Sequence, residues 1–171
     1  MPLLESAPLD DGTTARQLAL ALLGAATYGA AAGLGHGPAA ILRGAWMAPL
    51  YFVGGALLAT PPLYLASLQT GDRRSAEHLV REVGAVLGAL GVVLLGLSAP
   101  AAYFSATLRT SGATTLLVLS GLAVGAVAVA SLARRVFSEV SAAASLWTVF
   151  ALALGLRLTV TLSAQLPGVS P

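Results

Sequence analysis

The sequence predicts an all-α fold, a polytopic transmembrane helical bundle of about five spans, and three observations lead to this prediction. Hydrophobic residues make up 57% of the chain and charged residues only 9%, whereas about a quarter of a soluble domain is charged. The 9 basic and 7 acidic residues cannot cover the surface of a folded chain of 171 residues. The apolar residues also gather in stretches whose length is close to the roughly 20 residues that a helix needs to cross a bilayer.

The connections between these stretches are too short to hold another domain, so one transmembrane domain is expected over 17–166. A polar leader, 1–16, precedes it, and a short tail, 167–171, follows it. The leader is acidic rather than basic, so the first span is interpreted as a retained helix and not as a signal peptide. The spans are expected at about 17–35, 44–67, 80–105, 114–133 and 146–166.

Arginine is spread unevenly over the connections, and this sets the predicted orientation. Cytoplasmic connections carry an excess of basic residues. Arg43 and Arg109 flank the spans on the side opposite the N-terminus. The other side holds Arg16, Arg73, Arg74, Arg81, Arg134 and Arg135. We therefore expect a cytoplasmic N-terminus and an external tail.

The last five of these arginines would lie at the inner leaflet, where they can bind anionic headgroups. The positions of these arginines are explained equally well if they only set the orientation of the chain in the membrane. Aromatic side chains are expected to mark the two interfaces. The outer interface is assigned Trp46, Tyr103 and Phe104, and the inner one Tyr64, Phe137 and Trp147.

The third span is expected to extend beyond the membrane. From Ser75 to about Ser105 the pattern permits one helix near 45 Å long, at about 1.5 Å per residue. Its first two turns would stand in the cytoplasm.

Glycines four residues apart predict close contacts between helices, because small residues let two backbones approach. Such spacings occur in the first, third and fourth spans. The glycines are Gly29, Gly33 and Gly37, then Gly84 and Gly88, then Gly121 and Gly125. Either these faces contact another protein or a second copy of the chain, or they pack against a neighbouring span.

Prolines inside the second and third spans predict helix kinks, since proline removes a backbone donor. They are Pro49, Pro61, Pro62 and Pro100. Two interpretations stay open: a broken-helix substrate site, as in transporters, and kinks that only help the bundle to pack. The spacing also predicts an antiparallel hairpin of the second and third spans, with Pro49 and Pro100 at matching depth.

Arg157 is predicted to be an intramembrane charge, about ten residues from either end of the fifth span. A central Arg is costly in hydrocarbon, by about 3 kcal/mol on insertion scales. Three interpretations stay open. The side chain snorkels outward, it caps carbonyls that a proline leaves unbonded, or it meets an acid or a phosphate of an external partner.

The residue types exclude most catalytic chemistry. Cysteine is absent, and every basic residue is Arg, so thiolate, Schiff-base and P-loop lysine chemistry have no residues to use. His36 and His78 fall on opposite sides of the membrane and cannot share a metal. The acidic residues lie outside the spans. We expect no enzyme activity, no cofactor, no metal and no nucleic-acid partner.

Residues 28–104 carry a resemblance through apolar and proline motifs. These are Tyr28-Gly29, Ala48-Pro49-Leu50 with Phe52, Thr60-Pro61-Pro62-Leu63-Tyr64, and Ser98-Ala99-Pro100 with Tyr103-Phe104. The stretch resembles poorly characterised bacterial multi-span membrane proteins and, more distantly, the Yip1-type family. That resemblance implies five spans, a cytoplasmic N-terminus, a bacterial cytoplasmic membrane and a role in protein contacts. Trp46-Met47-Ala48 departs from the eukaryotic pattern, and no catalytic residues come with the resemblance.

Two functions are therefore expected from the sequence. The first is a non-enzymatic membrane scaffold or accessory subunit of a membrane protein complex, whose partners are the lipid bilayer and other membrane proteins or further copies of the chain. The alternative is a small transporter or channel component that works as an oligomer. A conduit needs several polar side chains at mid-depth, and a scaffold needs none.

Overall fold

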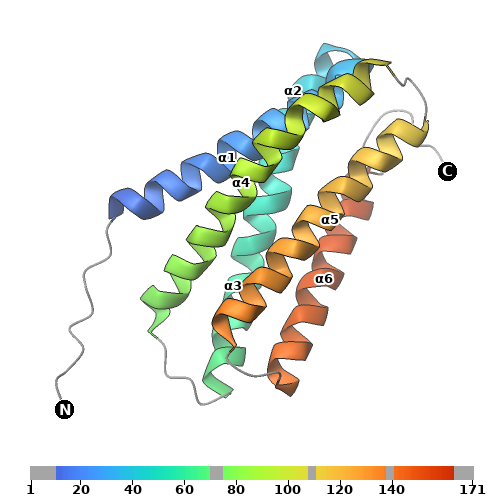
Figure 1. Ribbon diagram of the computed structural model, residues 1–171. Coiled ribbons are helices and arrows are strands. Elements are labelled where there is room, and N and C mark those ends of the chain that lie inside the picture. Colours follow the sequence, from blue (N-terminus) through green and yellow to red (C-terminus); the bar gives the residue numbers. More distant parts are fainter. Residues whose placement is uncertain (1–10, 70–74, 108–110, 138–140, 164–171) are drawn as a thin grey trace.

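The computed structural model describes residues 11–69, 75–107, 111–137 and 141–163 (Figure 1). Long helices account for nearly all of these residues, in agreement with a sequence rich in Ala and Leu, the strongest helix formers. The elements are α1 (Asp11–Gly33), η1 (Leu34–His36), α2 (Pro38–Pro49), η2 (Leu50–Gly54), α3 (Gly55–Gln69), α4 (Ala76–Thr107), α5 (Ser111–Val136) and α6 (Ala142–Ser163).

Five helices in the described residues are long and apolar enough to cross a membrane. α2, η2 and α3 follow one another without a break and together make the second of them. The five are Gly12–His36, Pro38–Gln69, Ala76–Thr107, Leu119–Val136 and Ala142–Thr159. The chain is thus an all-α, multi-pass integral membrane protein, and the predicted fold class is confirmed.

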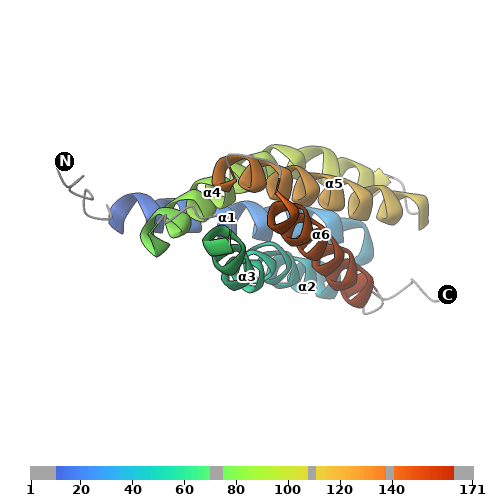
Figure 2. The same cartoon turned by 90° about the horizontal axis from the view of Figure 1, so that it is seen from below.

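Successive spans run in opposite directions. α1, α4 and α6 begin at one end of the bundle, and α2 and α5 begin at the other (Figure 1). α1 packs mainly on α4 and α2, and lies between them in Figure 2. α5 packs on α4 and α6, and α6 packs on α3 as well. The predicted hairpin of the second and third spans is therefore not the main pairing, because α1 takes the place beside α4.

Serine caps fix where two helices begin. The Ser75 hydroxyl accepts a hydrogen bond from the His78 amide at 3.3 Å, and the Ser141 hydroxyl accepts one from the Ala144 amide at 3.1 Å. Such caps satisfy amides that the first helical turn leaves unbonded. The single long helix predicted from Ser75 to about Ser105 is confirmed by α4. α6 starts about one turn earlier than predicted, because Ser141 caps it.

α1 also begins earlier than predicted, at Asp11, so its first residues belong to the stretch that was expected to be a leader. The rest of the leader, 1–10, and the predicted tail, 167–171, lie outside the described residues.

The helices run through all four prolines. The hydrogen-bonding pattern changes only after Pro49, where η2 is a π-helix that wraps one extra residue per turn. Pro49 cannot donate a backbone hydrogen bond, and this loosens the ladder at its position. α3 continues through Pro61 and Pro62, and α4 continues through Pro100 to Thr107. Of the spans that contain these prolines, only the second departs from regular α-helix.

Glycines allow the closest helix contacts. A Cβ atom added at Gly29 would overlap the backbone of Gly44 in α2, and one at Gly33 would lie 2.6 Å from the Ala40 carbonyl carbon. These two glycines of the first span therefore pack α1 against α2 of the same chain. Gly37 does not extend the ridge, because it forms the turn before α2 with a φ of 92°, where glycine is favoured.

The remaining predicted glycines differ from one another. Gly84 and Gly88 of α4 both face Gln17 of α1. A Cβ atom at Gly121 would lie 3.8 Å from Phe52 Cζ, whereas one at Gly125 would meet nothing within 4 Å. One close contact of α1 with α4 was not predicted: it joins Gly24 to Gly91, which have no glycine four residues away.

Candidate functional site

Polar side chains inside the bundle join helices that are distant in sequence. Tyr28 of α1 hydrogen-bonds Ser120 of α5, with 2.7 Å between their hydroxyl oxygens. Ser105 of α4 is 1% exposed; it accepts from the Gly35 amide at 2.9 Å and donates to the Ala32 carbonyl at 2.8 Å. Ser105 thus satisfies groups at the end of α1 that a helix terminus leaves unbonded.

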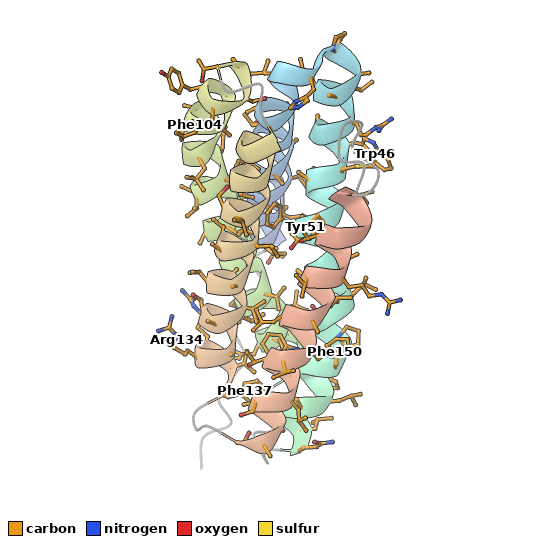
Figure 3. The ribbon with its side chains drawn as sticks, turned by 90° about the vertical axis from the view of Figure 1, so that its right-hand side faces the viewer. Trp46, Tyr51, Phe104, Arg134, Phe137 and Phe150 are labelled. Atoms are coloured by element: carbon orange, nitrogen blue, oxygen red, sulfur yellow. The ribbon has the colours of Figure 1, made fainter. Side chains whose placement is uncertain are left out.

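Tyr51 is the centre of a second group. It lies in η2, between the helices at mid-height of the bundle (Figure 3). Its hydroxyl donates to the Gly155 carbonyl at 3.1 Å and accepts from the Thr159 hydroxyl at 2.8 Å. The Thr159 hydroxyl also lies 2.9 Å from the same carbonyl. The Tyr51 ring packs edge-on against Phe52, with 4.8 Å between ring centroids. The π-helical turn of the second span is thereby fixed to α6.

Trp147 forms a third link between the same two spans. Its indole nitrogen donates to the Ala59 carbonyl of α3 at 3.1 Å, and the side chain is 3% exposed. Phe137, also buried, lies beside it with 6.3 Å between ring centroids. Both aromatics were predicted to anchor the inner interface, and both belong instead to the core. Trp46 is exposed and points away from the bundle in Figure 3, as an interface residue does.

A cavity of about 120 Å³ lies between these links. The second span, α4, α5 and α6 each contribute walls, and Tyr51 and Trp147 both line it. Almost every other lining residue is apolar. Three are glycines, one from each of α3, α5 and α6: Gly55, Gly125 and Gly155.

The polar atoms around this cavity already have partners. The Thr60 hydroxyl donates to the Ala56 carbonyl of its own helix at 2.7 Å. No buried side-chain nitrogen or oxygen in the described part of the chain lacks a hydrogen bond. Nor do the described residues include a group of three or more His, Cys, Asp and Glu side chains that could hold a metal. The cavity can therefore accept an apolar group.

The arginines lie mainly at one end of the bundle. Arg16 of α1 and Arg81 of α4 are exposed near the starts of their helices, and Arg134 is exposed near the end of α5 (Figure 3). Arg135 forms an ion pair with Glu82 of α4 at 3.4 Å. Exposed pairs of this kind contribute at most about 1 kcal/mol. Arg73, Arg74 and Arg109 fall outside the described residues.

Arg157 lies on the exposed side of α6. Gly155 and Leu158 of the same helix turn inward to the cavity. The mid-span position of Arg157 stays a prediction, because residues 164–171, which include the end of the predicted fifth span, lie outside the described residues.

No family model, no curated protein and no solved structure matches the chain closely enough to report a relative. The resemblance to Yip1-type proteins stays a prediction. The cavity and its links are therefore interpreted from their own geometry.

Proposed function

We propose that the chain is a non-enzymatic scaffold or accessory subunit of a membrane protein complex, and that it acts through helix–helix contacts with other membrane proteins. The observation that carries this proposal is how the interior polar groups are used. Tyr28, Tyr51, Ser105 and Trp147 each bond another helix of the same chain. These interior polar groups hydrogen-bond within the bundle, and this suits a structural role.

The proposal includes a place for the protein. The N-terminus lies in the cytoplasm and the membrane is the bacterial cytoplasmic membrane. Support comes from Arg16, Arg81, Arg134 and Arg135, which gather at the end of the bundle where α1 begins, because basic residues favour the cytoplasmic side. Their positive charge would also attract the anionic headgroups of that leaflet.

A second candidate is a small transporter or channel component that works as an oligomer. η2 favours it, because π-helical turns are frequent at functional sites and this one borders the cavity. The two functions differ in what a purified protein does alone. A transporter component reconstituted in vesicles moves a solute, whereas a scaffold requires its partner.

The contact surface is tested at Arg157, which the exposed side of α6 presents outward. We expect Arg157→Leu to raise thermal stability in detergent, because it removes the insertion cost of about 3 kcal/mol, and to lower recovery of a co-purifying membrane protein. Arg157→Lys is the control: a snorkelling side chain tolerates it, whereas a bidentate contact with a carboxylate does not. The measurement is affinity purification in mild detergent with quantitative mass spectrometry. If no membrane protein co-purifies with the unaltered chain, the scaffold proposal is wrong. If one does and Arg157→Leu retains it fully, only the contact at Arg157 is wrong.

A further inference from the structure

The cavity between η2, α3, α4, α5 and α6 is long rather than round. On α6 its lining runs from Trp147 to Leu158, about three turns or roughly 16 Å of helix. On α5 it runs from Leu122 to Leu132, a similar length. A volume of about 120 Å³ spread over that length leaves a narrow channel. Such a space suits an extended chain better than a compact molecule.

Glycines keep this space open. A Cβ atom added at Gly125 would meet nothing within 4 Å, and one at Gly55 would be 3.5 Å from the end of the Leu158 side chain. At Gly155 the nearest atom is the Tyr51 hydroxyl, at 3.6 Å. At Gly29, by contrast, the absent side chain lets two backbones touch. The glycines of the cavity thus leave room that no other part of the described chain fills.

The occupant must be apolar. Water needs two to four polar partners in a cavity, and here the hydroxyls of Tyr51 and Thr60 and the indole of Trp147 are already bonded to the protein. An apolar cavity of comparable volume, engineered into another protein, stays free of water and binds benzene. The cavity is not fully enclosed, and Leu152 of α6, which lines it, is itself 43% exposed on the outside of the bundle.

Because the bundle crosses a membrane, the apolar group that lies outside the bundle is the hydrocarbon of the bilayer. We propose that the cavity binds an acyl chain of a membrane lipid, which lies between the second span, α4, α5 and α6 alongside Tyr51 and Trp147. The lipid serves as a bound structural ligand that completes the packing of the bundle. This proposal does not depend on the scaffold function, because it concerns the isolated chain in a lipid bilayer.

The chain contains its own reporter for this site. It has 2 tryptophans, of which Trp147 lines the cavity and Trp46 is 57% exposed on α2. In the Trp46→Phe variant all tryptophan fluorescence comes from Trp147. Bromine quenches tryptophan only at near contact. The variant is reconstituted in phosphatidylcholine vesicles, with and without lipids brominated along their acyl chains.

We expect brominated lipids to quench Trp147 strongly in the Trp46→Phe variant, although the side chain is buried. Adding Gly125→Leu should fill the channel and at least halve the quenching. The matched control is Gly96→Leu, because Gly96 of α4 also has nothing within 4 Å of its Cβ position but lies on the exposed side of the helix, away from the cavity. It should leave the quenching unchanged. The Trp147→Phe variant, which retains Trp46, should be quenched with or without Gly125→Leu.

Two results would overturn the proposal: no quenching of Trp147 in the Trp46→Phe variant, or equal quenching with and without Gly125→Leu. Circular dichroism and thermal unfolding show whether each variant is folded. If Gly125→Leu is not, Gly55→Leu fills the channel from α3, where an added Cβ atom would meet only the flexible end of Leu158, at 3.5 Å. The same two results then apply to that variant.

Discussion

Trp147 shows how one side chain can join two spans. Its indole nitrogen donates to the backbone carbonyl of Ala59 across the contact of α6 with α3, and its ring contributes to the core beside Phe137. Interhelical hydrogen bonds in membranes contribute on average about 0.6 kcal/mol and at most about 1.7 kcal/mol. Losing the bond while also shrinking a buried ring therefore has a measurable cost.

We expect Trp147→Phe to lower the free energy of unfolding by about 1–2 kcal/mol, from the lost hydrogen bond and the smaller buried ring. Unfolding is followed by circular dichroism as a denaturing detergent is added to the protein in mild detergent. Trp46→Phe is the control for the same chemical change at an exposed site, and it should change stability little. Equal losses from the two substitutions would contradict the structural role given to Trp147.

The residues around Tyr51 show what sequence alone does not reveal. Hydropathy identifies the spans that carry Tyr51, Gly155 and Thr159, and Pro49 indicates an irregularity near the first of them. Nothing in the sequence says that the π-helical turn brings Tyr51 to Gly155, because this contact depends on how the second span is rotated against α6. Trp147 was assigned to the interface for a related reason: a tryptophan near the end of a span fits an interface and a core equally well.

At the scale of the helices, glycine contacts divide into two kinds. Gly29 faces Gly44 with the backbones of α1 and α2 in contact, whereas Gly96 of α4 faces open space. The same substitution therefore has opposite effects at the two positions. The alanine methyl is an obstacle in the first case, and in the second it only improves helix propensity.

Gly29→Ala is expected to destabilise the protein by about 1–3 kcal/mol, because α1 and α2 must move apart to admit the methyl group. Gly96→Ala should stabilise it by up to about 1 kcal/mol, the propensity difference between the two residues in a helix. The two free energies of unfolding are compared in the same detergent. If Gly29→Ala is as stable as Gly96→Ala, the close contact of the first two spans is wrong.

The helices themselves were predicted well in number and order and less well in their ends and partners. Five apolar stretches correspond to five spans because bilayer thickness fixes the length of each. The observed helix ends differ from the predicted ones because single side chains determine where a helix begins, as Ser141 does for α6. Glycine spacing predicts close packing, and added Cβ atoms at Gly29, Gly33, Gly84 and Gly88 would each meet a neighbouring helix, but spacing alone does not identify that helix. For that reason α1, and not the second span, proved to be the main neighbour of α4.

For the whole molecule, the central claim is a membrane bundle with an odd number of spans. Three of them, α4, α5 and α6, separate the connection before α4 from the C-terminal end of the chain, so these two points must lie on opposite sides of the membrane. The proposed orientation places the connection in the cytoplasm, because the described arginines gather mainly at the end of the bundle where α4 begins. Both parts of the claim can be read from two fusion proteins.

Alkaline phosphatase, which is active only outside the bacterial cytoplasm, is fused after Arg74 in one protein and after Ser170 in another, and both are expressed in bacteria. We expect activity from the fusion after Ser170 and none from the fusion after Arg74. A fluorescent protein that matures only in the cytoplasm should give the opposite pattern at the same two positions. Activity in the reverse order would contradict the orientation, and phosphatase activity at both positions would contradict the bundle of five spans.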